Sequence, residues 1–127
     1  MIKGIGTDLV SVERIERVLA RHPKAFTRRV LHPNEQIIFA DHHEPCAYLA
    51  KRFAAKEAVS KALGTGIAKG VSFHEIEISN DAFGRPLVEL HQHTKAIAES
   101  MGVQNCFLSL SDEKEYALAY VVLEGEN

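Results

Sequence analysis

The sequence has few of the residues that cross-link small proteins. Its 127 residues include only two cysteines, Cys46 and Cys106, which are far apart and form no Cys-X-X-Cys pair. A disulfide framework or a structural zinc site is therefore poorly supported, and buried or idle thiols are the expected use. Tryptophan is absent, which excludes nothing by itself.

Long hydrophobic runs are also missing. No stretch is apolar over the roughly 20 residues that a membrane-spanning helix needs. The opening residues, MIKGIGTDLV, carry glycine and aspartate where a secretory signal would be uniformly apolar. We therefore expect no membrane association and a cytoplasmic protein. With 46% hydrophobic and 25% charged residues, the chain is expected to form one globular domain over residues 1–127.

Seven histidines raise the question of a metal site. His42 and His43 stand near Cys46, and His91 stands near His93. Neither group has the paired ligand spacing of a zinc motif. Surface and packing roles are the preferred interpretation.

Charge is unevenly distributed although the formal net charge is only −2. Residues 1–29 hold seven Lys or Arg against three acids, whereas the remaining residues hold eight against fourteen. Arg14, Arg17 and Arg21 follow an i, i+3, i+7 pattern that predicts a basic ridge on a helix. The basic N-terminal part predicts an acidic partner, and the acidic remainder argues against a nucleic-acid groove across the molecule.

Hydrophobic spacing and turn residues predict strands and helices in a mixed order. Ser11 is the expected N-cap of a helix that begins at Val12. Further helices are expected at 34–41, 46–63 and 92–100, and strands at 1–8, 72–80, 87–91, 106–111 and 116–123. This order predicts an α+β fold with a mainly antiparallel sheet and a long central helix.

The first strand has one side that carries almost no side chains. Gly4 and Gly6 share that side, and Asp8 faces the same way if the strand is regular. This side can accept close neighbours. Without other information, Asp8 is more simply a turn or capping residue before the helix.

The helix at 46–63 carries the most informative pair of charges. Glu57 and Lys61 stand four residues apart, and Ala50 and Ala54 fall on the same side. The small alanines are expected to leave room for a ligand beside the two charges. On spacing alone, an exposed Glu–Lys pair is the more common use of this pattern.

Asp8 changes this interpretation if the fold brings it to Glu57. Two converging carboxylates repel each other, and a divalent cation such as Mg²⁺ relieves that repulsion. With Lys61 one turn away, such a site would suit a pyrophosphate. Gly64 follows the helix and is expected to be a left-handed cap, although its turn could also contact a bound nucleotide.

Two motifs in the right order resemble those of a known family. The segment Gly6-Thr7-Asp8 with Arg14 downstream, and the segment RFAAKEAVSKALGTGI at 52–67, are similar to the holo-[acyl-carrier-protein] synthase group of 4′-phosphopantetheinyl transferases. Residues 83–86 resemble the Gly-Lys-Pro turn of that family, and residues 108–111 resemble its penultimate strand. The resemblance covers the length of a whole family member.

The resemblance implies a specific reaction and a set of catalytic residues. The family moves 4′-phosphopantetheine from coenzyme A to a serine of apo acyl carrier protein, in support of fatty acid biosynthesis. Asp8, Glu57 and Lys61 would be the catalytic residues. Asp8 and Glu57 would hold Mg²⁺ with the coenzyme A pyrophosphate, and Lys61 would contact phosphate.

The resemblance also assigns binding surfaces. Arg52 and the turn formed by Gly84, Arg85 and Pro86 would bind coenzyme A near its 3′-phosphoadenosine end. Lys61 and Gly64 are also expected to bind coenzyme A. The ridge of Arg14, Arg17 and Arg21 would face the acidic recognition helix of the carrier protein. Family members form homotrimers with active sites at subunit boundaries, so these residues need not come from one chain.

Two positions depart from the family pattern, and two other functions remain open. Asp112 stands where many relatives carry histidine, and Arg85 replaces the commoner lysine, which keeps the charge but alters its geometry. One alternative is a regulatory module that binds coenzyme A or a nucleotide without chemistry. A second alternative is a purely structural trimer.

Overall fold

The computed structural model describes residues 1–126. The helices are α1 (Val12–Arg21), α2 (Pro23–Val30), α3 (Pro33–Ala40), α4 (Pro45–Ala62), the 3₁₀ turn η1 (Phe73–Glu75) and α5 (Gln92–Ser100). The strands are β1 (Ile2–Ser11), β2 (Ile76–Asn80), β3 (Pro86–Leu90), β4 (Asn105–Asp112) and β5 (Tyr116–Glu124). None of the helices within residues 1–126 is long and apolar enough to cross a membrane.

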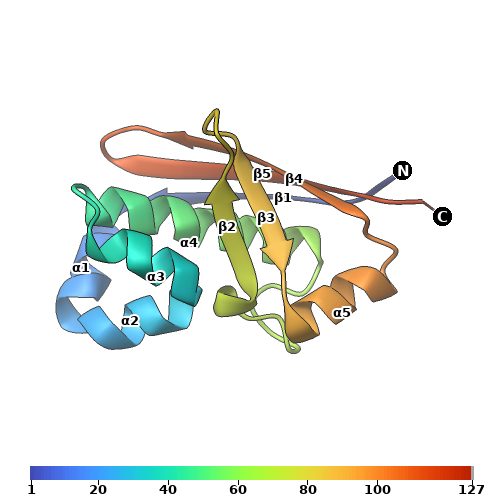
Figure 1. The fold of residues 1–127 in the computed structure, drawn as a ribbon, viewed down its shortest axis with the longest axis horizontal. Coiled ribbons are helices and arrows are strands. Elements are labelled where there is room, and N and C mark those ends of the chain that lie inside the picture. The colour runs from blue at the N-terminus through green and yellow to red at the C-terminus, as the bar shows by residue number, and fades with distance from the viewer. Residues whose placement is uncertain (127) are drawn as a thin grey trace.

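Two antiparallel sheets pack around the central helix α4 (Figure 1). The larger sheet has the strand order β1-β5-β4, and the smaller one is the β2–β3 hairpin. In Figure 1 the larger sheet lies along one side of α4, and α1, α2 and α3 gather near its N-terminal half. The expected α+β fold with a long central helix is confirmed, although the strands divide between two sheets.

Strand β1 and helix α4 approach each other at the level of the backbone. A Cβ atom at Gly6 would lie 2.0 Å from the carbonyl oxygen of Ala58, and one at Gly4 would lie 2.0 Å from that of Ala62. Only glycine fits at such distances. The side of β1 without side chains, predicted from the sequence, is therefore the side that packs on α4.

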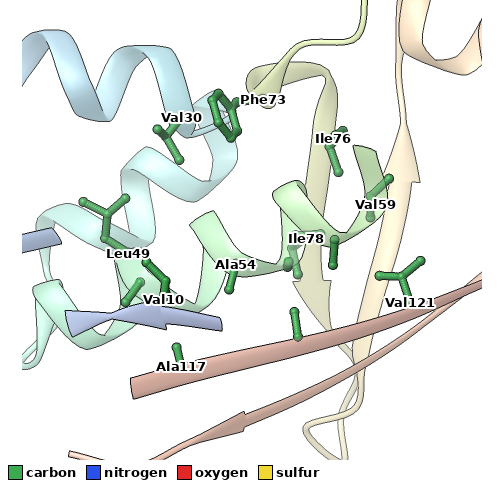
Figure 2. Close-up of a cluster of buried hydrophobic side chains, with 14 of the residues drawn as sticks. Val10, Val30, Leu49, Ala54, Val59, Phe73, Ile76, Ile78, Ala117 and Val121 are labelled. Atoms are coloured by element: carbon green, nitrogen blue, oxygen red, sulfur yellow. The ribbon is translucent and has the colours of Figure 1, made fainter. Parts of the chain in front are cut away.

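The core is built on both sides of α4 (Figure 2). Leu49, Ala54 and Val59 of this helix are fully buried, together with Val121 of β5 and Ile78 of β2. The alternating pattern of β5 places every second residue on α4 and leaves the others outside.

This packing corrects one expectation about α4. Ala50 and Ala54 were expected to leave room for a ligand, but both are fully buried. Their small side chains allow neighbouring elements to pack closely on the N-terminal half of the helix. The space beside Glu57 and Lys61 therefore does not extend along the helix toward these alanines.

Most predicted elements are present with shifts of one to three residues at their ends. Ser11 caps α1, because its side chain accepts a hydrogen bond from the backbone N–H of Arg14. Helix α2 was not predicted, although Pro23 at its first turn is a helix-start signal. The segment expected as a strand from residue 72 begins with the η1 turn, and β2 starts only at Ile76.

A buried ion pair joins α2, α3, α4 and β2. Lys56 is completely buried and donates to the carboxylate of Glu35 and, at 2.6 Å, to the carbonyl oxygen of Val30. Glu35 also accepts hydrogen bonds at 2.8 Å from the backbone N–H groups of His32 and Ile78. Burial lowers the pKa of Lys56 to about 8 despite the opposing effect of the Glu35 carboxylate.

Candidate functional site

Asp8 and Lys61 meet where β1 passes the last turn of α4. Lys61 Nζ lies 3.0 Å from Asp8 Oδ1 and 3.1 Å from the carbonyl oxygen of Thr7. The Asp8 side chain is 15% exposed, whereas that of Lys61 is 51% exposed. Among residues 1–126 the ion-pair partner of Lys61 is thus Asp8, and the alternative of an exposed Glu57–Lys61 pair is not observed.

Glu57 lies close enough to Asp8 for their charges to interact. Partial burial raises the pKa of the Glu57 carboxyl, and the negative charge of Asp8 raises it further. The positive charges of Lys61, Arg14 and Arg29 oppose this shift. Asp8 of β1 and Glu57 of α4 are therefore within electrostatic range of each other in one chain, together with Lys61, Arg14 and Arg29.

The chemistry of this acidic pair fits a hard divalent cation. Carboxylate oxygens are the ligands that Mg²⁺ prefers, and it commonly takes only one or two from the protein. A cation beside Asp8 and Glu57 would remove the repulsion that raises the pKa of Glu57. Lys61 supplies a third group suited to an anionic ligand that shares the cation.

The three arginines of α1 form the ridge that their spacing predicts. Arg14, Arg17 and Arg21 surround a shallow hollow of about 190 Å³ together with Val18. Arg14 is also one of the cations that act on the Glu57 carboxyl. The basic ridge therefore begins beside the acidic pair and runs away from it along α1.

A second group of predicted residues lies in a cleft of about 370 Å³ between α3, α4, the β2–β3 turn and β4. We call it the Arg52 cleft. Its lining residues are Ile38, His42, Tyr48, Lys51, Arg52, Asn80, Gly84, Pro86, Leu110 and Asp112. It therefore contains three of the residues predicted to bind coenzyme A, Arg52, Gly84 and Pro86, whereas Arg85 and Gly64 are not part of its lining.

Neighbouring side chains hold Arg52 in place. Arg52 Nη2 donates to Asn80 Oδ1 at 2.9 Å, and its Nε lies 4.0 Å from Glu35 Oε2. The guanidinium also lies over the ring of Tyr48, with its Cζ 4.7 Å from the ring centroid. Asp112 lines the same cleft, with its Oδ1 3.9 Å from Lys51 Nζ.

Two glycines adopt left-handed conformations beside these groups. Gly64 has φ +80 and donates from its N–H to the Lys61 carbonyl at 2.9 Å, which is the cap predicted from the sequence. Gly84 has φ +89 in the β2–β3 turn, and its carbonyl oxygen accepts a hydrogen bond from the Asn80 side chain. A Cβ atom at either glycine would meet nothing within 4 Å, so both backbones face open space.

The sequence and the fold match a known family. A model of the 4′-phosphopantetheinyl transferase superfamily matches residues 4–121. The chain belongs to this superfamily. It is 54% identical over 124 residues to the holo-[acyl-carrier-protein] synthase of Vibrio campbellii, covering 98% of both chains.

Solved structures agree with this transferase family. The holo-[acyl-carrier-protein] synthase of Neisseria meningitidis has a TM-score of 0.93 and 47% identity, with 98% of this chain and 99% of that chain covered. The enzyme of Helicobacter pylori, solved in complex with coenzyme A, has a TM-score of 0.83 and 37% identity, with 94% and 99% covered. The resemblance stated from the sequence motifs is confirmed.

Within one transferase chain the two groups of predicted residues lie on different sides of α4. Arg52 contacts β2 and α3, whereas Glu57 and Lys61 lie beside β1. The lining of the Arg52 cleft includes neither Asp8 nor these two residues. One chain therefore does not bring all the predicted binding residues into a single cavity.

A cluster of His32, Glu77 and His91 was not predicted as a site. Glu77 Oε1 lies 2.9 Å from His91 Nε2 and 3.6 Å from His32 Nε2. His32 Nδ1 accepts a hydrogen bond from the backbone N–H of Asn34, so the ring proton lies on Nε2 and points at Glu77. A hydrogen bond from the Asn34 side chain, followed by one from His91 and by the electrostatic effect of His32, holds the pKa of Glu77 below its usual value against the opposing effect of burial. These contacts fit a hydrogen-bonded cluster better than a metal site. A neutral imidazole has one available ring-nitrogen lone pair, and that of His32 already accepts the backbone N–H of Asn34.

Sequence reasoning missed several groups around the transferase site. Glu35 and Lys56 stand 21 residues apart, and no motif spacing relates them. Arg29 acts on Glu57 from α2, the helix that was not predicted. Tyr48 could have been noted from its place one turn before Arg52 on the predicted helix, which puts both side chains on one face.

Proposed function

We propose that this chain transfers the 4′-phosphopantetheine group of coenzyme A to a serine of apo acyl carrier protein. The products are holo carrier protein and adenosine 3′,5′-bisphosphate, and the reaction supports fatty acid biosynthesis. Family membership and the names of the relatives support this activity. The observation that carries it is the ion pair of Asp8 with Lys61, both of which lie within electrostatic range of the Glu57 carboxyl.

Asp8 and Glu57 are the proposed ligands of Mg²⁺. Bound there with the pyrophosphate, the ion would supply positive charge to the phosphate oxygens. Lys61 would add its own charge to the same oxygens from the last turn of α4. Its exposed ammonium can reach an incoming phosphate, since about half of the side chain is open to solvent.

The reaction joins the serine oxygen to the β-phosphorus of coenzyme A. As that bond forms, the bond from the β-phosphorus to the bridging oxygen breaks, and adenosine 3′,5′-bisphosphate leaves. Glu57 is the proposed acceptor of the serine proton, although a carboxylate that also holds the cation is a weaker base than a free one. Positioning and charge stabilisation account for most of the catalysis in such transfers.

The nucleotide end of coenzyme A is proposed to lie in the Arg52 cleft. Arg52 and the turn of Gly84, Arg85 and Pro86 would surround the 3′-phosphoadenosine. Gly64, which adjoins Lys61, would line the path of the pyrophosphate with its open backbone. Asp112 cannot replace a cationic contact from histidine, and its carboxylate faces Lys51 instead.

The basic ridge is the proposed docking surface for the carrier protein. Arg14, Arg17 and Arg21 form a continuous cationic surface that would face an acidic helix. Because Arg14 also lies near Glu57, a carrier bound on the ridge would present its serine beside the proposed base.

A homotrimer with shared active sites is part of the proposal, as is the cytoplasmic location. The outer face of the larger sheet carries exposed apolar side chains, and no element within residues 1–126 packs on it. These residues include Ile5, Leu9, Phe107, Leu118 and Tyr120. Association of this face with other copies would also allow the acidic pair of one chain to complete the Arg52 cleft of another.

Mass spectrometry of the carrier protein tests the function. The chain is incubated with Mg²⁺, coenzyme A and an apo acyl carrier protein, and the carrier is then weighed. We expect the mass of one phosphopantetheine to be added. A regulatory module would bind coenzyme A without changing the carrier, and a purely structural trimer would do neither.

The same assay tests Glu57 directly. Glu57→Gln keeps the shape of the side chain but removes the base and a metal ligand, so we expect a folded protein with transfer reduced at least 100-fold, the scale of general-base catalysis. Glu99→Gln, an exposed site on α5, is the matched control and should transfer normally. Near-normal turnover by Glu57→Gln would remove Glu57 from the mechanism.

A further inference from the structure

Helix α3 and the β2–β3 hairpin form two walls of the Arg52 cleft and lie side by side (Figure 1). Ile38 lines the cleft from α3, and Asn80 and Pro86 line it from the hairpin. A two-stranded sheet is only marginally stable by itself. The opening of the cleft therefore depends on the contacts that hold the hairpin against α3.

One of these contacts lies in the core. Glu35 of α3 is 1% exposed, and its Oε2 accepts a hydrogen bond from the backbone N–H of Ile78 on β2 at 2.8 Å. A hydrogen bond fixes the distance between two elements at one point, but elements joined at one point can still rotate about it. A second contact is needed to set the angle between α3 and β2.

The adjoining residues of both elements make the second contact. Asn34 Nδ2 donates to Glu77 Oε2 at 2.9 Å. The other carboxylate oxygen, Oε1, lies 2.9 Å from His91 Nε2 and 3.6 Å from His32 Nε2. His32 is the N-cap of α3 and His91 directly follows β3, and their rings stack with centroids 5.0 Å apart. We call Asn34, His32, His91 and Glu77 the Glu77 cluster, which joins the start of α3 to both strands of the hairpin.

The Glu77 carboxylate is suited to this role because it stays ionised. The hydrogen bond from Asn34, followed by that from His91, lowers its pKa against the opposing effect of burial. Hydrogen bonds to an ionised group are about twice as strong as those between neutral groups. The Glu77 side chain is 13% exposed, so solvent competes little for these contacts.

The Glu77 cluster lies at the end of the two walls that is away from the cleft. Asn34 precedes Ile38 by four residues, about 6 Å along a helix, and Glu77 precedes Asn80 by three residues, about 10 Å along a strand. A change of angle at the cluster is therefore carried to the cleft, where it alters the distance between Ile38 and the hairpin.

We propose that Glu77 is a positioning residue that holds α3 against the β2–β3 hairpin through Asn34 and thereby sets the opening of the Arg52 cleft for coenzyme A. This inference rests on the proposed function, which puts coenzyme A in this cleft. Among residues 1–126, neither Glu77 nor Asn34 lines the cleft, so the effect passes through its walls. A cleft held at the right width before binding loses less conformational freedom when the ligand enters, which favours affinity.

Reversing the Asn34–Glu77 hydrogen bond tests the inference. Asn34→Asp removes the donor and sets a second carboxylate against Glu77. Adding Glu77→Gln restores the bond with its roles exchanged, because the new amide at position 77 donates to the new carboxylate at position 34 while its oxygen still accepts from His91. An acidic residue is favourable in the first turn of a helix, so Asn34→Asp does not by itself weaken α3.

Calorimetric titration of the full chain with coenzyme A gives the first readout. Asn34→Asp should bind coenzyme A about three- to tenfold more weakly, since a hydrogen bond to a charged group is lost, and the double variant should bind like the wild type. Asn34→Ala removes the donor without adding a charge and should show a smaller loss. Gln104→Glu adds the same charge at an exposed site outside the cleft lining and is the matched control, expected to bind like the wild type.

Two further measurements separate positioning from a purely structural role. In the transfer assay Asn34→Asp should raise KM for coenzyme A by the same factor and leave kcat unchanged, because the acidic pair lies on the other side of α4. A lower unfolding temperature of Asn34→Asp with unchanged coenzyme A affinity would show that the contact serves the fold alone, and would overturn the inference. Binding that stays weak in the double variant would overturn it as well, because the loss would then not come from the broken contact.

The mass assay of the carrier protein keeps this inference distinct from the proposed function. Weaker coenzyme A binding by Asn34→Asp and its recovery in the double variant would support the positioning role even if the wild type left the carrier unmodified, which would overturn the proposed transfer. Carrier modification by the wild type, with equal coenzyme A affinity of the wild type and Asn34→Asp, would support the transfer and overturn the positioning role.

Discussion

The Glu35–Lys56 pair should be the most sensitive polar contact in the fold. Lys56→Met removes the closer cation and leaves the Glu35 carboxylate almost completely buried, with the N–H groups of His32 and Ile78 and, at 4.0 Å, Arg52 Nε as its remaining partners. Breaking one partner of a buried ion pair costs about 3–5 kcal/mol. Because domains of this size are stable by about 5–15 kcal/mol, the variant should lose a large part of its stability.

Urea unfolding followed by far-ultraviolet circular dichroism measures this loss without relying on tryptophan fluorescence, since the chain has no tryptophan. Wild type and variants are compared at one protein concentration, because subunit association would otherwise shift the midpoint. Lys95→Met, at an exposed site on α5, is the control and should change stability by less than about 0.5 kcal/mol. If Lys56→Met lowered the free energy of unfolding by less than about 1 kcal/mol, with an unchanged dependence of that free energy on urea concentration, the reasoning would be refuted.

The pH dependence gives the same prediction a second readout. The Lys56 pKa of about 8 in the folded state lies below its unfolded value of 10.5, so between these values the unfolded chain binds more protons. The contribution of Lys56 to stability therefore rises as pH increases from about 8 to 10.5, and is lost again as pH falls through 8. Lys56→Met should lack this rise, and an unchanged pH profile in the variant would contradict the assignment.

Three other changes test separate parts of the structure. Arg21→Glu should weaken carrier binding, and the loss should depend on salt concentration, while coenzyme A binding persists. Lys114→Glu is the control and should bind the carrier like the wild type. If Arg21→Glu did not change carrier affinity, the ridge would be an ordinary solvated helix face. Gly6→Ala should destabilise the fold by about 1–3 kcal/mol or more, because the new methyl group would collide with the Ala58 backbone; urea unfolding at wild-type midpoint would disprove that contact. Leu118→Lys places a charge on the outer sheet face, and sedimentation should show smaller assemblies than the wild type forms; an intact trimer would exclude this face as the interface.

The sequence predicted the parts of this fold that depend on local pattern. The strong helix formers of α4, the N-cap at Ser11 and the left-handed Gly64 are each specified within a few residues. The family resemblance, and not spacing alone, is what related Asp8 to the helix that carries Glu57 and Lys61, and the structure shows Asp8 paired with Lys61. Apart from α2, which was not predicted, the remaining elements differ mainly at their ends, where hydrogen bonding decides the boundary.

Local sequence patterns did not predict the contacts between residues far apart in the chain. Nothing within the helix at 46–63 shows that Lys56 is buried against Glu35, since a lysine is usually exposed. The same limit explains why Ala50 and Ala54 were assigned to a ligand space when they lie in the core. The separation of the Arg52 cleft from the acidic pair also depends on which face of α4 each neighbouring element covers.

The central claim is that Asp8 and Glu57 share one divalent ion beside Lys61. A crystal structure of the chain with coenzyme A and Mn²⁺ in place of Mg²⁺ tests it most directly, because the anomalous signal of manganese locates the ion independently of the protein. We predict a peak bound by the carboxylates of Asp8 and Glu57 and by pyrophosphate oxygens. A fully occupied coenzyme A with no peak between these two side chains, or with the ion bound elsewhere, would contradict the account.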